Sequence, residues 1–167
     1  MLAQRGTALK ANDWFEPMLT NAARRTNVCT AVPLKVSDED IMSVLGMYHD
    51  FRKRFPEMTQ AADARHIKVW DSVDDETAYS WFESLAGAIN DQMGASEEVT
   101  NLSSIFSYFD ELLRGSDKKI KNCIDVSFVE NLFWEVQPSS AANAWDAMPH
   151  SMQQLYVRFH GRQPTSD

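Results

Sequence analysis

Apolar side chains recur three or four positions apart along two central stretches of the chain, at residues 78–93 and 102–113. The two stripes consist of Ala78, Trp81, Phe82, Leu85, Ile89 and Met93, and of Leu102, Ile105, Phe106, Phe109, Leu112 and Leu113. This spacing is typical of a helix that packs one face against a core. We therefore predict two amphipathic helices here.

Capping signals flank both stripes. Asp74 or Asp75 is the expected N-cap of the first helix, and Ser96 is the expected N-cap of the second. Gly94 and Gly115 follow the two stripes, where glycine commonly ends a helix. The boundaries of both helices can therefore be predicted from local residue types.

Three further helices are predicted to begin at Ser37, Asp117 and Pro149. Ser37 and Asp40 form a capping-box pattern, and Pro56 marks the expected end of that helix. The core-facing positions are Ile41, Val44, Leu45, Tyr48 and Phe51; Ile120, Ile124, Phe128 and Leu132; and Met152, Leu155, Tyr156 and Phe159. The middle helix also carries Cys123, Val126, Val129 and Phe133, which indicates a central, buried position. Gly161 is the expected end of the last helix.

Three segments carry weaker signals. Residues 57–73 are ambiguous, because His66–Trp70 fits either a short strand or a buried turn of helix. Pro138–Ser140 is predicted to be a loop. Within residues 1–36, Asp13–Arg25 is compatible with a short helix and Val28–Val36 with an extended stretch.

No run of residues shows the sustained alternation of a strand. We predict an all-α fold, a compact bundle of about five to seven helices packed as antiparallel neighbours, with a short extended segment near the N-terminus. The predicted organisation is an N-terminal extension at residues 1–36, a helical domain at 37–161 and a tail at 162–167.

The acidic residues are concentrated in the middle third of the chain. The whole chain has 24 acidic and 16 basic residues and a net charge of −8, which argues against a nucleic-acid binder. Eleven of the acids lie between Asp71 and Asp117, opposed there by Arg114 alone. That segment carries −10, whereas the rest of the chain sums to +2.

Two groups of these acids lie where helices are expected to begin, and helix capping needs only one or two acids at each start. The excess is either a solvated face or a surface that docks a basic protein partner. On the second interpretation, the partner-binding residues are Asp71, Asp74, Asp75, Glu76, Glu97 and Glu98. Most of the five tryptophans are expected in the core, but Trp70 beside Asp71, or Trp145 beside Asp146, could be an exposed interface anchor.

Motifs for catalysis or metal binding are missing from the sequence. The four histidines and two cysteines form no zinc-binding pattern, and there is neither a Gly-x-Ser-x-Gly nor a glycine-rich phosphate loop. Cys29 and Cys123 are interpreted as free thiols, with Cys123 in the core, and a disulfide between them is the alternative. We expect no enzyme, no metal and no cofactor, although a carboxylate-type hydrolase remains an alternative. No membrane span or secretory signal is seen, so a cytoplasmic protein is expected. The expected oligomeric state is a monomer or a weak homodimer.

Four segments in the second half of the chain, taken in order, form a recognisable pattern. SSIFSYFDELL at residues 103–113 precedes a Gly-Ser-Asp turn, and IDVSFVENL follows at 124–132. WDAMP at 145–149 and LYVRFHG at 155–161 complete the series. Over roughly residues 40–161 this order resembles a family of small bacterial helical domains of uncharacterised function, found near polymorphic toxins and secretion-system effectors. The family offers no catalytic residues, and Glu130 and Asn131 are expected to bond a neighbouring loop or helix end.

Neighbours of such toxins are usually immunity proteins. The resemblance therefore implies a protein that binds and neutralises a cognate antibacterial toxin. Because the chain is acidic, the expected toxin has a basic surface and is a cytoplasm-acting nuclease, delivered by a secretion system such as type VI. The alternative is a helical adaptor or effector chaperone that leaves its partner active.

Overall fold

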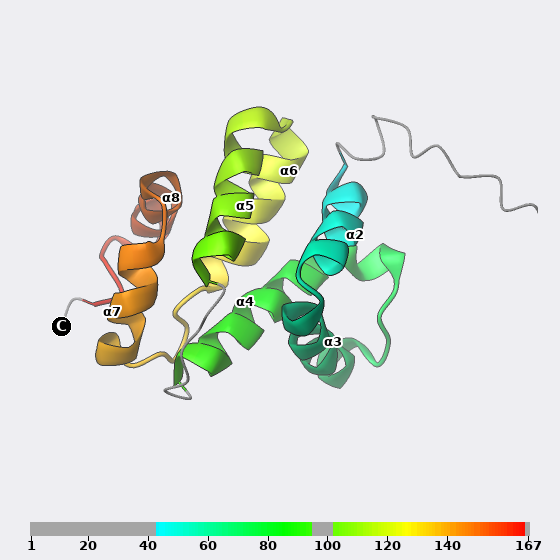
Figure 1. Cartoon of the computed structure of the whole chain (residues 1–167), viewed down its shortest axis with the longest axis horizontal. Coiled ribbons are helices and arrows are strands. Elements are labelled where there is room, and N and C mark those ends of the chain that lie inside the picture. Colours follow the sequence, from blue (N-terminus) through cyan, green and yellow to red (C-terminus); the bar gives the residue numbers. More distant parts are fainter. Residues whose placement is uncertain (1–42, 95–101, 166–167) are drawn as a thin grey trace, which may run out of the picture. The chain divides into compact units, whose positions relative to one another are not determined.

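The computed structural model describes residues 43–94 and 102–165, and within them the chain forms seven α-helices and no strand (Figure 1). The helices are α2 (Val44–Arg54), α3 (Pro56–Trp70), α4 (Ala78–Gly94), α5 (Leu102–Gly115), α6 (Lys118–Cys123), α7 (Pro138–Ala147) and α8 (His150–His160). Three short elements join them: the 3₁₀ turns η1 (Asp75–Thr77) and η3 (Val129–Asn131), and the π-helical turn η2 (Ile124–Phe128). The predicted all-α bundle is confirmed.

Several predictions lie outside the described residues. These are the helix start at Ser37, the cap at Ser96, the carboxylates Glu97 and Glu98, and the elements expected within residues 1–36. The chain separates into two units, Met1–Leu34 and Lys35–Asp167. All described residues belong to the second unit.

Helix α4 contacts α2, α3, α7 and the short elements after α6. All six positions of its predicted stripe are buried. Phe109 of α5 stacks on Phe51 of α2 with ring centroids 5.6 Å apart, and its ring lies 4.1 Å from that of Phe128. The predicted stripe of α5 is buried from Leu102 to Phe109 but only partly buried at Leu112 and Leu113. The core therefore forms where α2, α4 and α5 meet the turn after α6.

Of the ambiguous segment 57–73, residues 57–70 are helical and residues 71–73 are not. Its buried residues, Met58, Thr59, Ala62 and His66, have helical spacing, but two of them are polar. Polar residues at buried positions hide the apolar stripe on which the sequence prediction depends. Pro56 ends α2 as predicted, and it also occupies the first turn of α3, where its missing N–H costs nothing.

Three other predictions need correction. Pro138–Ser140 is the start of α7 and not a loop, because Pro138 lies at a first-turn position and Ala141 and Trp145 bury one face. The helix expected after Asp117 is divided into α6, the π turn and a 3₁₀ turn. Leu45, Val126 and Phe159 were expected to face the core but are exposed. In contrast, the caps at Asp117 and Gly161 are confirmed.

Candidate functional site

The predicted acidic residues at the α3–α4 junction come together on one short connection, residues 71–77, which we call the acidic turn. Asp71 ends α3 in the left-handed conformation with φ 61°, and its N–H donates to the Ile67 carbonyl at 2.9 Å. Asp74 is extended and accepts hydrogen bonds from the Thr77 N–H at 3.0 Å and the Ser72 hydroxyl at 2.9 Å. These bonds lower the pKa of the Asp74 carboxyl, because they stabilise its charged form. The turn is therefore a fixed structure with an ionised cap.

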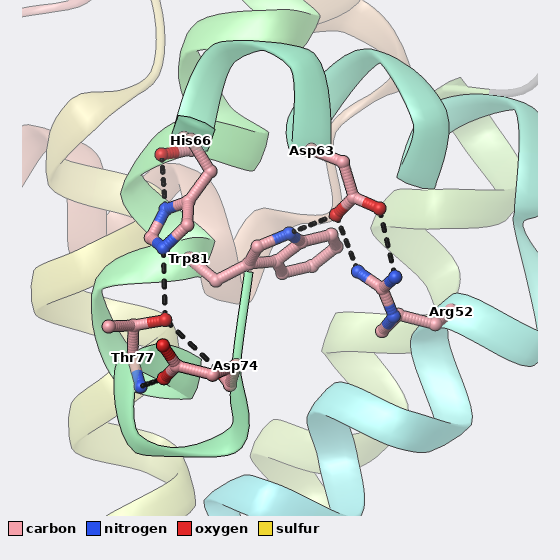
Figure 2. Close-up of polar contacts among 7 residues, drawn as sticks. Arg52, Asp63, His66, Asp74, Thr77 and Trp81 are labelled. Atoms are coloured by element: carbon pink, nitrogen blue, oxygen red, sulfur yellow. Dashed lines mark hydrogen bonds and ion pairs between the residues drawn. The ribbon is translucent and has the colours of Figure 1, made fainter. Parts of the chain in front are cut away.

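A buried histidine fastens the acidic turn to the helix that follows it. The fully buried ring of His66 in α3 lies with Nδ1 2.9 Å from the Ser84 hydroxyl and Nε2 3.0 Å from the Thr77 hydroxyl (Figure 2). The Thr77 hydroxyl donates its own proton to the Asp74 carbonyl at 3.0 Å, so it accepts from His66 Nε2–H. The Ser84 hydroxyl then donates to Nδ1. Burial lowers the pKa of His66 and keeps the ring neutral.

The same histidine supports an exposed tryptophan. The indole of Trp70, one turn along α3, stacks on the His66 ring with centroids 5.9 Å apart and an interplanar angle of 20°. Trp70 remains 47% exposed, and its α3 neighbours Ile67 and Val69 are exposed as well. One side of the indole is thus held by a buried group while the other meets solvent. This arrangement presents a rigid aromatic surface directly beside the acidic turn.

The carboxylates of the acidic turn have few cationic partners. Asp71, Asp74, Asp75 and Glu76 are all exposed. Asp75 lies 3.3 Å from His49 Nε2, with both side chains more than half exposed. Among the described residues, no ion pair involves the other three carboxylates. Four of the six predicted binding residues therefore share one turn, and the two others lie outside the described residues.

Behind the turn, a second polar cluster joins three helices. The Asp63 carboxylate of α3 accepts from the Arg52 guanidinium of α2 at 2.5 and 2.8 Å, and from the Trp81 indole N–H of α4 at 2.8 Å (Figure 2). The guanidinium lies 5.0 Å from the centroid of the Tyr48 ring. The hydrogen bond with Asp63 raises the pKa of Arg52. This cluster fixes the relative positions of the helices that carry the acidic turn and Trp70.

Residues 48–162 match a domain of unknown function, DUF7674. The chain belongs to the DUF7674 family. No curated protein and no solved structure matches the chain. The matched region includes the acidic turn, Trp70 and His66, so the candidate surface is part of the family domain and lies outside the N-terminal segment.

The described residues include one cysteine and several His, Asp and Glu side chains that could in principle act as a nucleophile or as metal ligands. Cys123 is fully buried, and burial raises the pKa of its thiol to about 12, so the reactive thiolate is suppressed. Within the described residues, no three His, Cys, Asp or Glu side chains are grouped to hold a metal ion. No helix in residues 43–94 and 102–165 is long and apolar enough to cross a membrane.

The sequence alone does not show that His66 supports Trp70 and the acidic turn. The spacing of four residues between His66 and Trp70 permits their rings to stack on a helix. Of the two candidate anchors, Trp70 is exposed and Trp145 is buried. Of the four described tryptophans, Trp81 and Trp145 are buried and Trp70 and Trp134 are exposed, whereas Trp14 lies outside the described residues.

Proposed function

We propose that this DUF7674 protein is an immunity protein that binds a cognate antibacterial toxin with a basic surface and blocks its activity. The toxin we propose is a nuclease that acts in the cytoplasm after delivery by a secretion system. The observation that supports the proposal is the exposed Trp70, held on buried His66 beside four exposed carboxylates.

Tryptophan is enriched among residues that dominate binding energy at protein interfaces, especially where a rigid indole enters a pocket of the partner. Since His66 already fixes one face of Trp70, little side-chain entropy is lost on binding. The neighbouring carboxylates add long-range attraction for a basic surface and favour one orientation of encounter. A nuclease needs a basic surface to bind phosphates, and an acidic turn is complementary to such a surface.

The direct test is co-expression with the product of the adjacent gene, purification by size-exclusion chromatography and measurement of growth. We expect a stable complex and rescued growth. We also expect the nuclease activity of the purified toxin to fall when this protein is added. A complex whose partner stays fully active would favour the adaptor or effector-chaperone alternative. The absence of any complex would contradict the proposal.

A charge-reversal variant tests the contribution of the acidic turn to toxin binding. Asp75→Lys with Glu76→Lys changes two exposed carboxylates and leaves the Asp74 cap intact. The association rate should fall about tenfold or more at low ionic strength, and the difference should shrink in high salt. The matched control is Glu111→Lys with Asp146→Lys, which makes the same charge change at exposed positions on α5 and α7. Equal effects of the two variants would show that only net charge matters.

A further inference from the structure

A second exposed tryptophan lies on the segment that joins η3 to α7. Trp134 is 68% exposed, and its two neighbours are both left-handed, with φ 62° at Phe133 and φ 58° at Glu135. Residues other than glycine adopt this conformation at a cost in free energy, so it persists only where the surroundings hold it. The backbone on both sides of Trp134 is therefore held in the left-handed conformation, and the indole between these two residues is exposed.

A buried asparagine of α4 holds this segment. Asn90 Nδ2 donates to the Asn131 carbonyl at 2.8 Å, and the Phe133 N–H donates to Asn90 Oδ1 at 2.7 Å. Asn131 in turn donates to the carbonyls of Val126 and Ser127, both at 3.1 Å, as expected for a residue that bonds a helix end. The Phe133 ring is buried. Trp134 is thus presented by a fixed backbone.

Beside Trp134 lies a pocket of about 350 Å³ whose lining includes Arg65 of α3, Glu83 and Asp91 of α4, and Glu135. Arg65 donates to Asp91 at 2.7 Å, so its charge already has a partner. The Arg65 side chain crosses α4 at Gly87, where an added Cβ would lie 2.1 Å from Arg65 Nε. Among the described residues, no ion pair involves Glu83 or Glu135. The pocket therefore has an excess of two carboxylates beside an open indole.

Trp134 and Glu135 also line a second pocket of about 370 Å³, whose lining includes Val136, Pro138 and Tyr156. The indole therefore belongs to the lining of two pockets. A small cation would occupy only one of these pockets, whereas a protein partner can place one side chain in each of them. This shape fits a protein partner better than a metabolite.

We propose that the exposed indole of Trp134 and the pocket lined by Glu83 and Glu135 form a second protein-binding site, which receives one lysine or arginine side chain of a partner. The indole attracts a cation through its face, and the two carboxylates provide opposite charge. An anionic group would be repelled, and a neutral apolar one would leave the carboxylates desolvated without partners. The site shares no residue with the acidic turn, so it does not depend on the toxin proposal.

Nuclear magnetic resonance of the ¹⁵N-labelled full chain tests the site through the indole N–H signals, assigned with single Trp→Phe variants. The probes are the capped tripeptide Gly-Arg-Gly and the neutral control Gly-Gln-Gly. We expect the arginine peptide to shift the Trp134 signal saturably, with a dissociation constant in the millimolar range that rises with added salt. The signal of buried Trp81 should not move.

Two outcomes would overturn the proposal. One is no saturable shift of Trp134 at peptide concentrations up to about 100 mM. The other is an equal shift with the glutamine peptide, because the site would then not select a cation. A shift confined to Trp70 would also overturn it and would instead support the acidic turn. Failure of this site and failure of the proposed function can therefore be distinguished.

Charge-neutralising variants sharpen the result. Glu83→Gln with Glu135→Gln should weaken binding of the arginine peptide about twofold to fivefold, since exposed charge pairs contribute modestly. Trp134→Ala should abolish the saturable shifts of backbone signals around the pocket. The control is Glu57→Gln, an exposed residue of the first turn of α3. An equal loss of affinity in the control would contradict the assigned role of the two carboxylates.

Discussion

The two exposed tryptophans of this domain are presented in different ways. Trp70 stacks on a buried histidine whose hydrogen bonds to Ser84 and Thr77 also fix the acidic turn. Trp134 lies on a strained backbone that a buried asparagine holds through two main-chain hydrogen bonds. The first support is a titratable ring, whereas the second is an amide that does not titrate. The comparison shows that an exposed aromatic side chain can be held in place either by packing against another side chain or by the conformation of its backbone.

The largest expected effect comes from removing the backbone support. Asn90→Ala leaves the buried Phe133 N–H and the Asn131 carbonyl without their partner, and should lower the free energy of unfolding by about 2–4 kcal/mol. Urea unfolding measures this loss. Asn143→Ala, at an exposed position of α7, is the control and should change stability by no more than about 0.5 kcal/mol. Similar losses in the two variants would show that Asn90 is not a special support.

A smaller loss is expected from His66→Phe. The phenyl ring preserves stacking on Trp70 but removes both ring nitrogens, which leaves the Ser84 and Thr77 hydroxyls without that partner. The free energy of unfolding should fall by about 1–3 kcal/mol, again measured in urea. The indole signal of Trp70 should move more than that of Trp134, because only the first depends on His66. Equal movement of both signals would break the distinction between the two supports.

The His66 support should also respond to pH. Burial lowers the pKa of His66 in the folded chain, so the unfolded chain takes up a proton first as the pH falls through about 6.5. The stability that His66 contributes is therefore fully present above that pH and is lost progressively below it. The difference in unfolding free energy between wild type and His66→Phe should shrink from pH 8 to pH 5. A constant difference over this range would contradict the inferred neutral state of the ring.

The smallest expected effect on stability comes from the exposed indoles themselves. Trp70→Ala and Trp134→Ala should each lower the free energy of unfolding by no more than about 1 kcal/mol, because neither indole is in the core: Trp70 is 47% and Trp134 68% exposed. Thermal unfolding is a sufficient measurement. A loss of several kcal/mol in either variant would show that the indole is a structural residue, and its exposure would then be no sign of binding.

The sequence predicts the helices that carry a continuous stripe of apolar residues, and misses those that do not. All six stripe positions from Ala78 to Met93 are buried as predicted, although α4 also buries the polar residues Ser84 and Asn90. In α3, Thr59 and His66 occupy buried positions, and in α7 the buried face is mostly alanine. In neither helix do the buried positions form an apolar stripe that differs clearly from the surrounding residues. Hydrophobic spacing therefore identifies a helix only where large apolar residues fill enough of the buried positions to form a continuous stripe.

The candidate sites were predictable to different degrees. Charge density along the chain identified Asp71, Asp74, Asp75 and Glu76, because residues adjacent in sequence must also be neighbours on a short turn. Trp134 could not be distinguished from a core tryptophan, since an exposed anchor and a buried ring have the same local sequence pattern. The left-handed conformations at Phe133 and Glu135 carry no glycine or asparagine signal, and the Phe133 N–H is held by Asn90, which is distant in the sequence.

Affinity for the toxin in the Trp70→Ala variant tests the central claim most directly. The measurement is the dissociation constant of the complex with the product of the adjacent gene, by titration calorimetry, for wild type and for the variant. If Trp70 is the anchor of the interface, its loss should weaken binding by about thirtyfold or more, as expected for a residue that dominates binding energy. Wild-type affinity in a folded Trp70→Ala protein would contradict the claim that this surface binds the toxin.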